Sequence, residues 1–189
     1  MNLVEIRSCL SSDLSLKLKL DGTTKPSSVL VVIYGLEPKI LMTKKSEILK
    51  LHAGQISFPG GKWDEKDKDL LETAIRETRE EINLEIKPEQ IMGQLKPVTT
   101  RNSGYMITPF IAVIDNLSIL KQNLEIDTIL HIPLIQFLKT LADDKDPNHQ
   151  SIEEMYTFNF KDYLVWGASA RILKQIFDIL EKNNIIQDF

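Results

Sequence analysis

The segment spanning residues 52–84 constrains the fold of this chain more than any other part of the sequence. It contains Phe-Pro-Gly-Gly at positions 58–61, a turn signal that the interior of a helix cannot accommodate. Between residues 68 and 82 there is neither proline nor glycine, and the apolar residues recur at helical spacing. The segment therefore predicts a turn that is followed closely by an amphipathic helix.

The predicted helix gathers carboxylates on one side. At about 100° per residue, Glu77, Glu80 and Glu81 lie together, away from the apolar stripe. Three carboxylates within one turn repel one another unless a cation lies among them. Arg76 can pair with Glu80, four residues later, and a hard divalent cation with oxygen ligands would balance the remaining charge. A solvated acidic face is the alternative interpretation of this helix taken by itself.

The turn and the helix together closely resemble the Nudix box, the sequence motif of the Nudix hydrolase family. The resemblance is carried by Gly61, Asp67 and residues 76–84. The usual box has glutamate in place of Asp67, a spacer one residue shorter before the arginine, an apolar residue in place of Thr78 and glycine in place of Asn83. Asn83 is a mild departure, because asparagine tolerates the left-handed conformation that often ends a helix. The R-E-x-x-E-E core of the box is intact.

This resemblance implies an α/β fold, an α/β/α sandwich with a mixed β-sheet between helices. It also implies hydrolysis of a phosphoanhydride with Mg²⁺ or Mn²⁺ as the cofactor, and it assigns roles to individual residues. The implied metal ligands are the carboxylates of Glu77, Glu80 and Glu81 and the backbone carbonyl of Gly60, while Arg76 orients Glu80.

A further glutamate is a candidate for catalysis. Glu125 precedes an apolar run that predicts a strand, at a place where many Nudix enzymes have an additional catalytic or metal-binding glutamate. Asp127 competes for the same role, and a solvated strand edge is the alternative for both.

Residues 41–61, upstream of the box, are similar to the additional signature of the coenzyme A pyrophosphatases within the Nudix group. Every spacing of that signature is kept, but Met42 replaces leucine, and Lys45 and Lys50 stand where the family has arginine. Lysine retains the charge and loses the bidentate fork for a phosphate, and an exposed basic loop is the alternative interpretation. The residues expected on the coenzyme A side are Lys45, Lys50, His52, Gly54, Gln55 and Phe58.

Two members of these segments also have simpler interpretations. A single histidine such as His52 more often packs or forms a hydrogen bond than acts as a ligand or base. Trp166, in a Trp-Gly-x-Ser-Ala segment that also resembles the coenzyme A pyrophosphatases, is better interpreted as a core residue from the sequence alone.

The function implied by the resemblance is hydrolysis of the diphosphate bond of coenzyme A or a derivative, giving adenosine 3′,5′-bisphosphate and 4′-phosphopantetheine or its acyl form. Another Nudix hydrolase activity, on ADP-ribose, a dinucleotide or a nucleoside triphosphate, is the first alternative. A non-catalytic Nudix-fold binding module is the second, although such modules usually lose carboxylates that this box retains.

Composition limits the partners that we expect. The chain has 189 residues and a net charge of -4, and no basic block points to nucleic acid. Its single cysteine excludes an internal disulfide. No apolar run approaches the ~20 residues of a membrane span, and the N-terminal segment does not resemble a targeting signal. We therefore expect a cytoplasmic protein, monomeric or homodimeric, whose partner is a small nucleotide substrate.

Hydrophobic periodicity and turn signals predict the order of the elements. Residues 1–28 form an N-terminal extension with a short helix and a further turn at 14–20, and residues 29–189 form one domain. The expected strands are 29–34, 40–44, 55–58, 91–98, 105–114, 125–133 and 156–160, the expected helices are 68–82, 134–141 and 169–182, and residues 143–151 form a loop.

Overall fold

The computed structural model describes residues 2–15, 24–49, 52–100, 103–146, 149 and 155–186. Its main sheet is mixed and has eight strands. At the centre, β1 (Lys25–Tyr34) and β7 (Tyr105–Ile114) pair in parallel along their whole lengths. The strand β2 (Lys39–Lys45) forms a hairpin with β1 and also pairs with β8 (Ile126–Pro133) and β3 (Ile56–Ser57). The short strand β4 (Gly60–Lys62) pairs with β1, and β5 (Ile91–Gln94) and β6 (Val98–Thr99) pair with β7.

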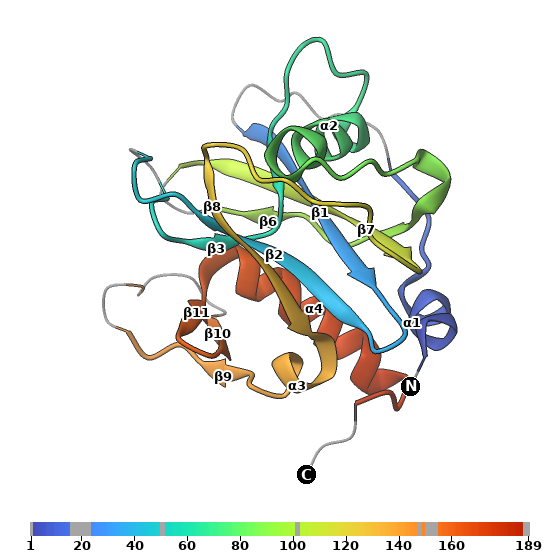
Figure 1. Cartoon of the computed structure of the whole chain (residues 1–189). Coiled ribbons are helices and arrows are strands. Elements are labelled where there is room, and N and C mark those ends of the chain that lie inside the picture. The colour runs from blue at the N-terminus through green and yellow to red at the C-terminus, as the bar shows by residue number, and fades with distance from the viewer. Residues whose placement is uncertain are drawn as a thin grey trace.

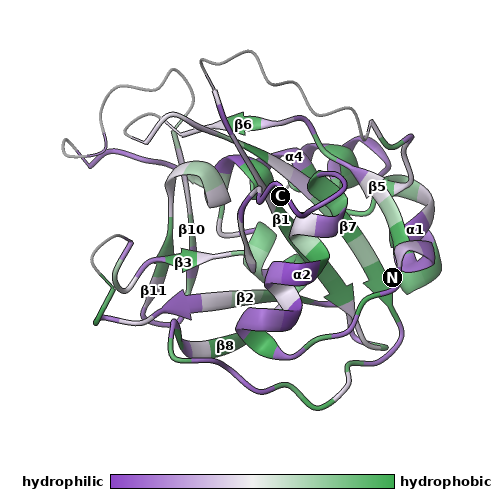
Figure 2. Cartoon of the chain, turned by 90° about the horizontal axis from the view of Figure 1, so that it is seen from above, coloured by the Kyte–Doolittle hydropathy of each residue, from purple (hydrophilic) through white to green (hydrophobic). Residues whose placement is uncertain are grey.

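Helices cover both faces of this sheet (Figure 1). The helix α2 (Leu70–Ile82) lies on one face, and α4 (Gly167–Lys182) lies on the other. Figure 2, seen from the α2 side, shows the hydrophilic residues of this helix above the hydrophobic centres of β1 and β7. The remaining elements are α1 (Leu3–Leu10), the 3-10 turn η1 (Pro88–Gln90), α3 (Leu134–Leu138), β9 (Ala142–Asp143), β10 (Tyr156–Phe160) and β11 (Tyr163–Val165). This architecture confirms the predicted α/β/α sandwich.

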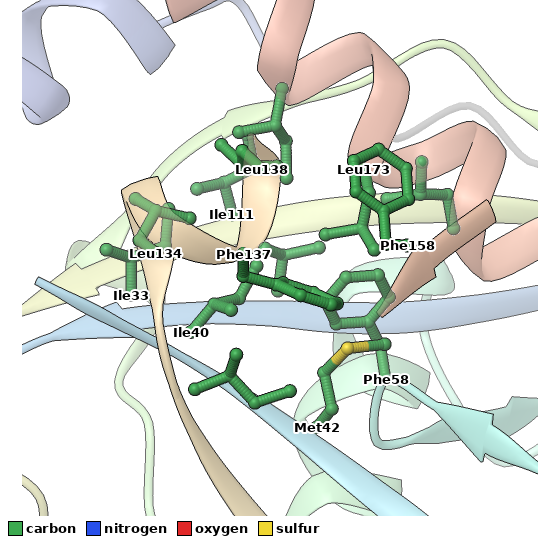
Figure 3. Close-up of a cluster of buried hydrophobic side chains, with 14 of the residues drawn as sticks. Ile33, Ile40, Met42, Phe58, Ile111, Leu134, Phe137, Leu138, Phe158 and Leu173 are labelled. Atoms are coloured by element: carbon green, nitrogen blue, oxygen red, sulfur yellow. The ribbon is translucent and has the colours of Figure 1, made fainter. Parts of the chain in front are cut away.

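Two hydrophobic clusters hold the layers together, because alternate side chains of a strand point to opposite faces. From β1, Leu30 and Val32 pack on the α2 side, whereas Val31 and Ile33 pack on the α4 side. Figure 3 shows the α4-side cluster, where side chains of the sheet meet aromatic residues from α3 and β10. A strand with both faces buried reads as a continuous apolar run, and this is why β1 was recognisable in the sequence.

The observed element boundaries differ from the expected ones where proline and glycine act through tertiary contacts. The predicted strand 91–98 is divided into β5 and β6 ahead of Val98, where Pro97 has no amide proton for a ladder hydrogen bond. The glycine pair expected to form only a turn also belongs to β4, since Gly60 and Gly61 pair with β1. Of the further turn expected at 14–20, residues 16–20 lie outside the described residues.

The N-terminal helix α1 packs on the sandwich. Its apolar residues Leu3, Ile6 and Leu10 are buried in the α4-side cluster. The guanidinium of Arg7 donates to the carbonyl of Val113 at 3.2 Å and pairs with the carboxylate of Asp115 at 2.8 Å. Strand β1 begins within the predicted extension, and the division at residue 28 stays a prediction. Among the described residues, no helix has the length and apolar character needed to cross a membrane.

Candidate active site

The ends and the interior of α2 explain how the helix tolerates its unusual residues. Asp69 caps the N-terminus by accepting a hydrogen bond from the Glu72 amide at 2.9 Å. Asn83 ends the helix in the left-handed conformation, with φ 56°, as its position in the sequence predicted. Thr78 is fully buried, and its hydroxyl donates to the Ala74 carbonyl at 2.7 Å, so its polar group is satisfied where the family motif has an apolar residue.

Arg76 contacts the acidic side chains of Asp67, Glu77 and Glu80. Its Nε and Nη2 donate to the two carboxylate oxygens of Asp67, each at 2.8 Å. Its Nη1 contacts Glu77 at 2.9 Å and Glu80 at 3.2 Å. The predicted Arg76–Glu80 pair is therefore present, and the same guanidinium also moderates the repulsion between Glu77 and Glu80.

Asp67 is the main partner of Arg76, a role that the sequence alone did not reveal. Its side chain is buried, and it also accepts hydrogen bonds from the Thr73 hydroxyl at 2.8 Å and the Asp64 amide at 3.2 Å. The hydrogen bonds from Arg76 hold the pKa of Asp67 below its ordinary value, although burial opposes this. The signal available in the sequence was the position of Asp67 within the box, where the motif has another acidic residue.

Glu81 is buried, with only 2% of its surface exposed, and it forms an ion pair with the ammonium of Lys45 on β2. Its other carboxylate oxygen accepts a hydrogen bond from the Gly60 amide at 3.4 Å. Desolvation raises the pKa of Glu81, while Lys45 opposes that shift. A carboxylate so placed needs a cation beside it, and Lys45 supplies that charge here.

The two glycines of β4 make room for this carboxylate cluster. A Cβ atom on Gly61 would lie 2.6 Å from Oε1 of Glu77, so any side chain there would displace that carboxylate. Gly60 has φ +152°, and a Cβ atom on it would lie 2.6 Å from the Cα atom of Val29. Burial raises the pKa of Glu77, and the hydrogen bond from Arg76 opposes that shift. Glu77 and Glu81 thus lie against the glycine backbone.

The donor groups fit a hard divalent cation in their chemistry. Carboxylate oxygens and the adjacent backbone of Gly60 are the ligand types that Mg²⁺ and Mn²⁺ prefer. In the part of the chain that the structure describes, no group of three or more His, Cys, Asp or Glu side chains is already arranged to hold a metal ion. The glutamates instead form ion pairs, Glu81 with Lys45, and Glu77 and Glu80 with Arg76. A metal ion at this cluster would compete with Lys45 for Glu81.

The expected coenzyme A loop folds back on β2. The amide of Gly54 donates to the Lys45 carbonyl at 3.1 Å, and the Lys45 amide donates to the Gln55 carbonyl at 2.9 Å. Nδ1 of His52, which is exposed, lies 2.8 Å from Oε1 of Gln55. Lys45 is thus held at the carboxylate cluster by its backbone and its ammonium, whereas Lys50 lies outside the described residues.

Phe58, expected on the substrate side, is instead a core residue. It is 2% exposed and lies in the α4-side cluster beside Met42 and Phe137 (Figure 3). A side chain so enclosed has no surface on which to contact a substrate. Its role in the signature is therefore to anchor the strand that leads into Gly60 and Gly61.

Truncating this side chain tests that assignment. We expect Phe58→Ala to lower the free energy of unfolding by about 3–5 kcal/mol, because it removes buried apolar contacts and leaves a cavity. Phe58→Leu should lose less, since leucine fills more of the space. Urea unfolding followed by circular dichroism measures both values. A change in substrate KM in Phe58→Leu without any change in stability would contradict the core assignment.

The two acidic candidates of β8 differ in their surroundings. Glu125 is exposed just ahead of the strand, and its carbonyl accepts a hydrogen bond from the Ser46 amide at 2.8 Å. Asp127 pairs with Lys44 at 3.2 Å, and hydrogen bonds from Lys44 hold its pKa below its ordinary value. The backbone of Glu125 adjoins the segment that carries Lys45, whereas the Asp127 side chain is bound to Lys44. The additional catalytic role of either residue stays a prediction.

Trp166 is partly exposed and not a fully buried core residue. Its ring stacks on the imidazole of His149, with centroids 3.8 Å apart and an angle of 9° between the planes. Nδ1 of His149 lies 2.8 Å from the carboxylate of Asp144. These contacts attach the segment before β10 to the start of α4.

Comparisons with known proteins agree with the geometry of this site. Residues 24–115 match the profile of the NUDIX domain. A Photorhabdus laumondii protein called "Uncharacterized Nudix hydrolase NudL" is 32% identical over 160 residues, which cover 82% of this chain and 84% of that protein. A protein of the same name from Yersinia enterocolitica is 32% identical over 143 residues, which cover 74% of this chain and 73% of that protein.

Solved structures show the same fold at low sequence identity. A MutT/nudix family protein from Enterococcus faecalis has a TM-score of 0.61 and 14% identity, and the match covers 90% of this chain and 66% of that protein. A NUDIX hydrolase from Alicyclobacillus acidocaldarius has a TM-score of 0.57 and 16% identity, with coverage of 82% and 91%. A bifunctional NMN adenylyltransferase/ADP ribose pyrophosphatase from Francisella tularensis, complexed with AMP and a Mn ion, has a TM-score of 0.50 and 19% identity, with coverage of 59% and 34%.

Proposed function

Because the chain belongs to the Nudix hydrolase family, we propose that it hydrolyses the diphosphate bond of coenzyme A or one of its derivatives. The arrangement of Glu77 and Glu81 against the glycine backbone of β4 supports cleavage of a phosphoanhydride. The coenzyme A substrate is supported by residues 41–61, which keep the spacing of the coenzyme A signature, and by the hydrogen bonds of Gly54 and Gln55 with Lys45.

Nudix hydrolases in general use divalent metal ions such as Mg²⁺ or Mn²⁺, and the Francisella tularensis neighbour was crystallised with Mn. In this chain Glu77, Glu80 and Glu81, with the backbone of Gly60, would hold the ion. A bound ion would neutralise charge on the diphosphate and lower the pKa of the attacking water.

The chain's own residues then have separate tasks. Glu77 and Glu81 supply negative charge in a partly desolvated place, where that charge attracts a cation strongly. Arg76 orients Glu77 and Glu80 and is itself held by Asp67. Lys45, released from Glu81 by a competing cation, is free to contact the substrate's phosphates. Glu125 is the candidate for accepting the proton of the attacking water.

Hydrolysis of another nucleoside diphosphate compound is the competing function. The glutamates of α2 act on the phosphoanhydride alone, so they do not distinguish coenzyme A from ADP-ribose or a dinucleotide. A non-catalytic binding module fits less well, because all three box carboxylates are kept and two of them lie at the glycine backbone.

Parallel kinetics on three compounds test the substrate. We expect kcat/KM for coenzyme A to exceed those for dephospho-coenzyme A and ADP-ribose by about tenfold or more, if one charge-assisted contact of roughly 1.5–3 kcal/mol distinguishes them. The measurement uses equal metal concentration and ionic strength, with the products identified by mass. Equal or faster turnover of ADP-ribose would overturn the coenzyme A assignment and leave the Nudix hydrolase assignment in place.

A further inference from the structure

Two lysines and one tyrosine meet at the start of β1, on three neighbouring strands. In the sheet register, Lys25 of β1 is opposite Tyr105 of β7, and Ser27 of β1 is opposite Lys62 of β4. Lys25 and Ser27 are two residues apart and share a face, so the side chains of Lys25, Lys62 and Tyr105 emerge together. The ammonium groups of Lys25 and Lys62 lie 5.5 Å and 5.4 Å from the centroid of the Tyr105 ring.

The ammonium groups of these two lysines can interact with an anionic ligand. Throughout the described ranges, neither Lys25 nor Lys62 has a carboxylate within salt-bridge distance, unlike Lys44 and Lys45. Both are exposed, and each ammonium lies over the ring of Tyr105. Such a pair of cations attracts an anion, and a doubly charged phosphate would relieve their mutual repulsion.

Hydrogen bonds hold the backbone of Tyr105, whose ring lies at the centre of this patch. The Tyr105 amide donates to the Thr100 hydroxyl at 2.8 Å, and the Thr100 amide donates to the Tyr105 carbonyl at 2.7 Å. The Lys25 amide donates to the Gly104 carbonyl at 3.1 Å, which attaches the same loop to β1. These hydrogen bonds join the backbone of Thr100, Tyr105 and Lys25 below the patch.

The patch adjoins the reaction centre. Lys62 directly follows Gly61, where Glu77 lies against the backbone, and the Lys62 carbonyl accepts a hydrogen bond from Nη2 of Arg76 at 3.4 Å. Consecutive Cα atoms are about 3.8 Å apart, so the path from the carboxylates to the Lys62 side chain is short. The side chain leaves β4 on the face away from α2, which is the face that Ser27 of β1 shares.

We propose that Lys25 and Lys62, held by the ring of Tyr105, bind a phosphomonoester on the ribose of the substrate, next to the diphosphate that is cleaved. This inference rests on the proposed function, because the 3′-phosphate of coenzyme A is such a group. It assigns recognition of that phosphate to the β1–β4–β7 corner and leaves Lys45 to the diphosphate that is cleaved. These are specificity-determining residues that leave the cleavage step itself unchanged.

Binding measurements without turnover test the proposal. Isothermal titration calorimetry should show that adenosine 3′,5′-bisphosphate binds the wild-type protein about tenfold more tightly than AMP, and less so as salt rises. Lys25→Gln and Lys62→Gln should each reduce that advantage and leave the affinity for AMP nearly unchanged. Arginine at either position should retain it, and Tyr105→Phe should retain more of it than Tyr105→Leu. Lys161→Gln, which removes another exposed lysine that lies over an aromatic ring, is the matched control.

Kinetics with the same variants separate this proposal from the proposed function. The ratio of kcat/KM for coenzyme A to that for dephospho-coenzyme A should fall toward one in Lys25→Gln and Lys62→Gln. A wild-type advantage that survives in both variants, or the absence of any advantage for the bisphosphate in calorimetry, would overturn the subsite. Failure of the enzyme to cleave coenzyme A, together with a bisphosphate advantage that depends on these lysines, would overturn the proposed substrate and retain the subsite.

Discussion

Replacing Glu81 with glutamine is expected to reduce turnover by roughly 10²- to 10³-fold or more, because it removes a charged metal ligand from a desolvated place. The substitution keeps the shape of the side chain, and a glutamine oxygen can still accept a hydrogen bond from Lys45. The loss should therefore appear in kcat and in Mn²⁺ affinity, which electron paramagnetic resonance measures directly. Glu77→Gln should behave in the same way, since Glu77 lies at Gly61.

The burial of Glu81 adds a consequence for stability. Glu81→Gln leaves the Lys45 ammonium beside a neutral partner, while it also removes a carboxylate whose desolvation is unfavourable. These effects oppose each other, so we expect only a small change in melting temperature without metal. Glu72→Gln, on an exposed position of the same helix, is the control for a general effect of lost charge. Wild-type turnover of either Glu81→Gln or Glu77→Gln at saturating metal would show that the metal assignment is wrong.

Replacing Arg76 with alanine is expected to have the second largest effect, on stability as well as on activity. It leaves Asp67 buried without its guanidinium partner, which should lower the free energy of unfolding by about 3 kcal/mol. It also removes the contacts that orient Glu77 and Glu80, and a loss of this kind typically reduces activity or metal affinity by roughly 10- to 100-fold. Arg76→Lys should recover only part of both, because an ammonium cannot form the bidentate pair.

The dependence on pH distinguishes the Asp67 contact from a general effect. The folded-state pKa of Asp67 lies below its unfolded value of 3.8, mainly because of Arg76. The contribution of the pair to stability is therefore present above pH 3.8 and is lost as the pH falls through the folded-state pKa. Urea unfolding at neutral and acidic pH should show the gap between wild type and Arg76→Ala narrowing in acid. Arg79→Ala, on an exposed part of α2, is the control, and a gap that is the same at both pH values would contradict the Asp67 assignment.

Several features of the site could be predicted from local sequence because they depend on short-range geometry. The limits of α2 follow from the capping side chain of Asp69 and from an asparagine at its end, and both act within one turn. The grouping of Glu77, Glu80 and Glu81 follows from helical periodicity, and so does the pairing of Arg76 with Glu80. The central strands β1 and β7 were recognisable because residues buried on both faces form continuous apolar runs.

Other features depended on which distant residues the fold brings together. Phe58 belongs to a substrate signature by sequence, yet the packing of α3 and β10 encloses it in the core. The predicted strand 91–98 is interrupted before Val98, and its two parts, β5 and β6, each pair with β7. The glycine pair reads as a turn, and it becomes a strand only through its pairing with β1.

The family, the α/β class and the grouping of the carboxylates follow from motif spacing and from the periods of helices and strands. The ion pairs between residues far apart in the chain depend on the tertiary structure. Lys45 reaches Glu81 across 36 residues of sequence because β2 pairs with β3, the strand just before the glycine strand β4, and α2 packs against β4. Lys25, Lys62 and Tyr105 gather because the sheet register places them side by side. The interaction energy of two charges depends on their distance in space, and separation along the chain does not specify that distance.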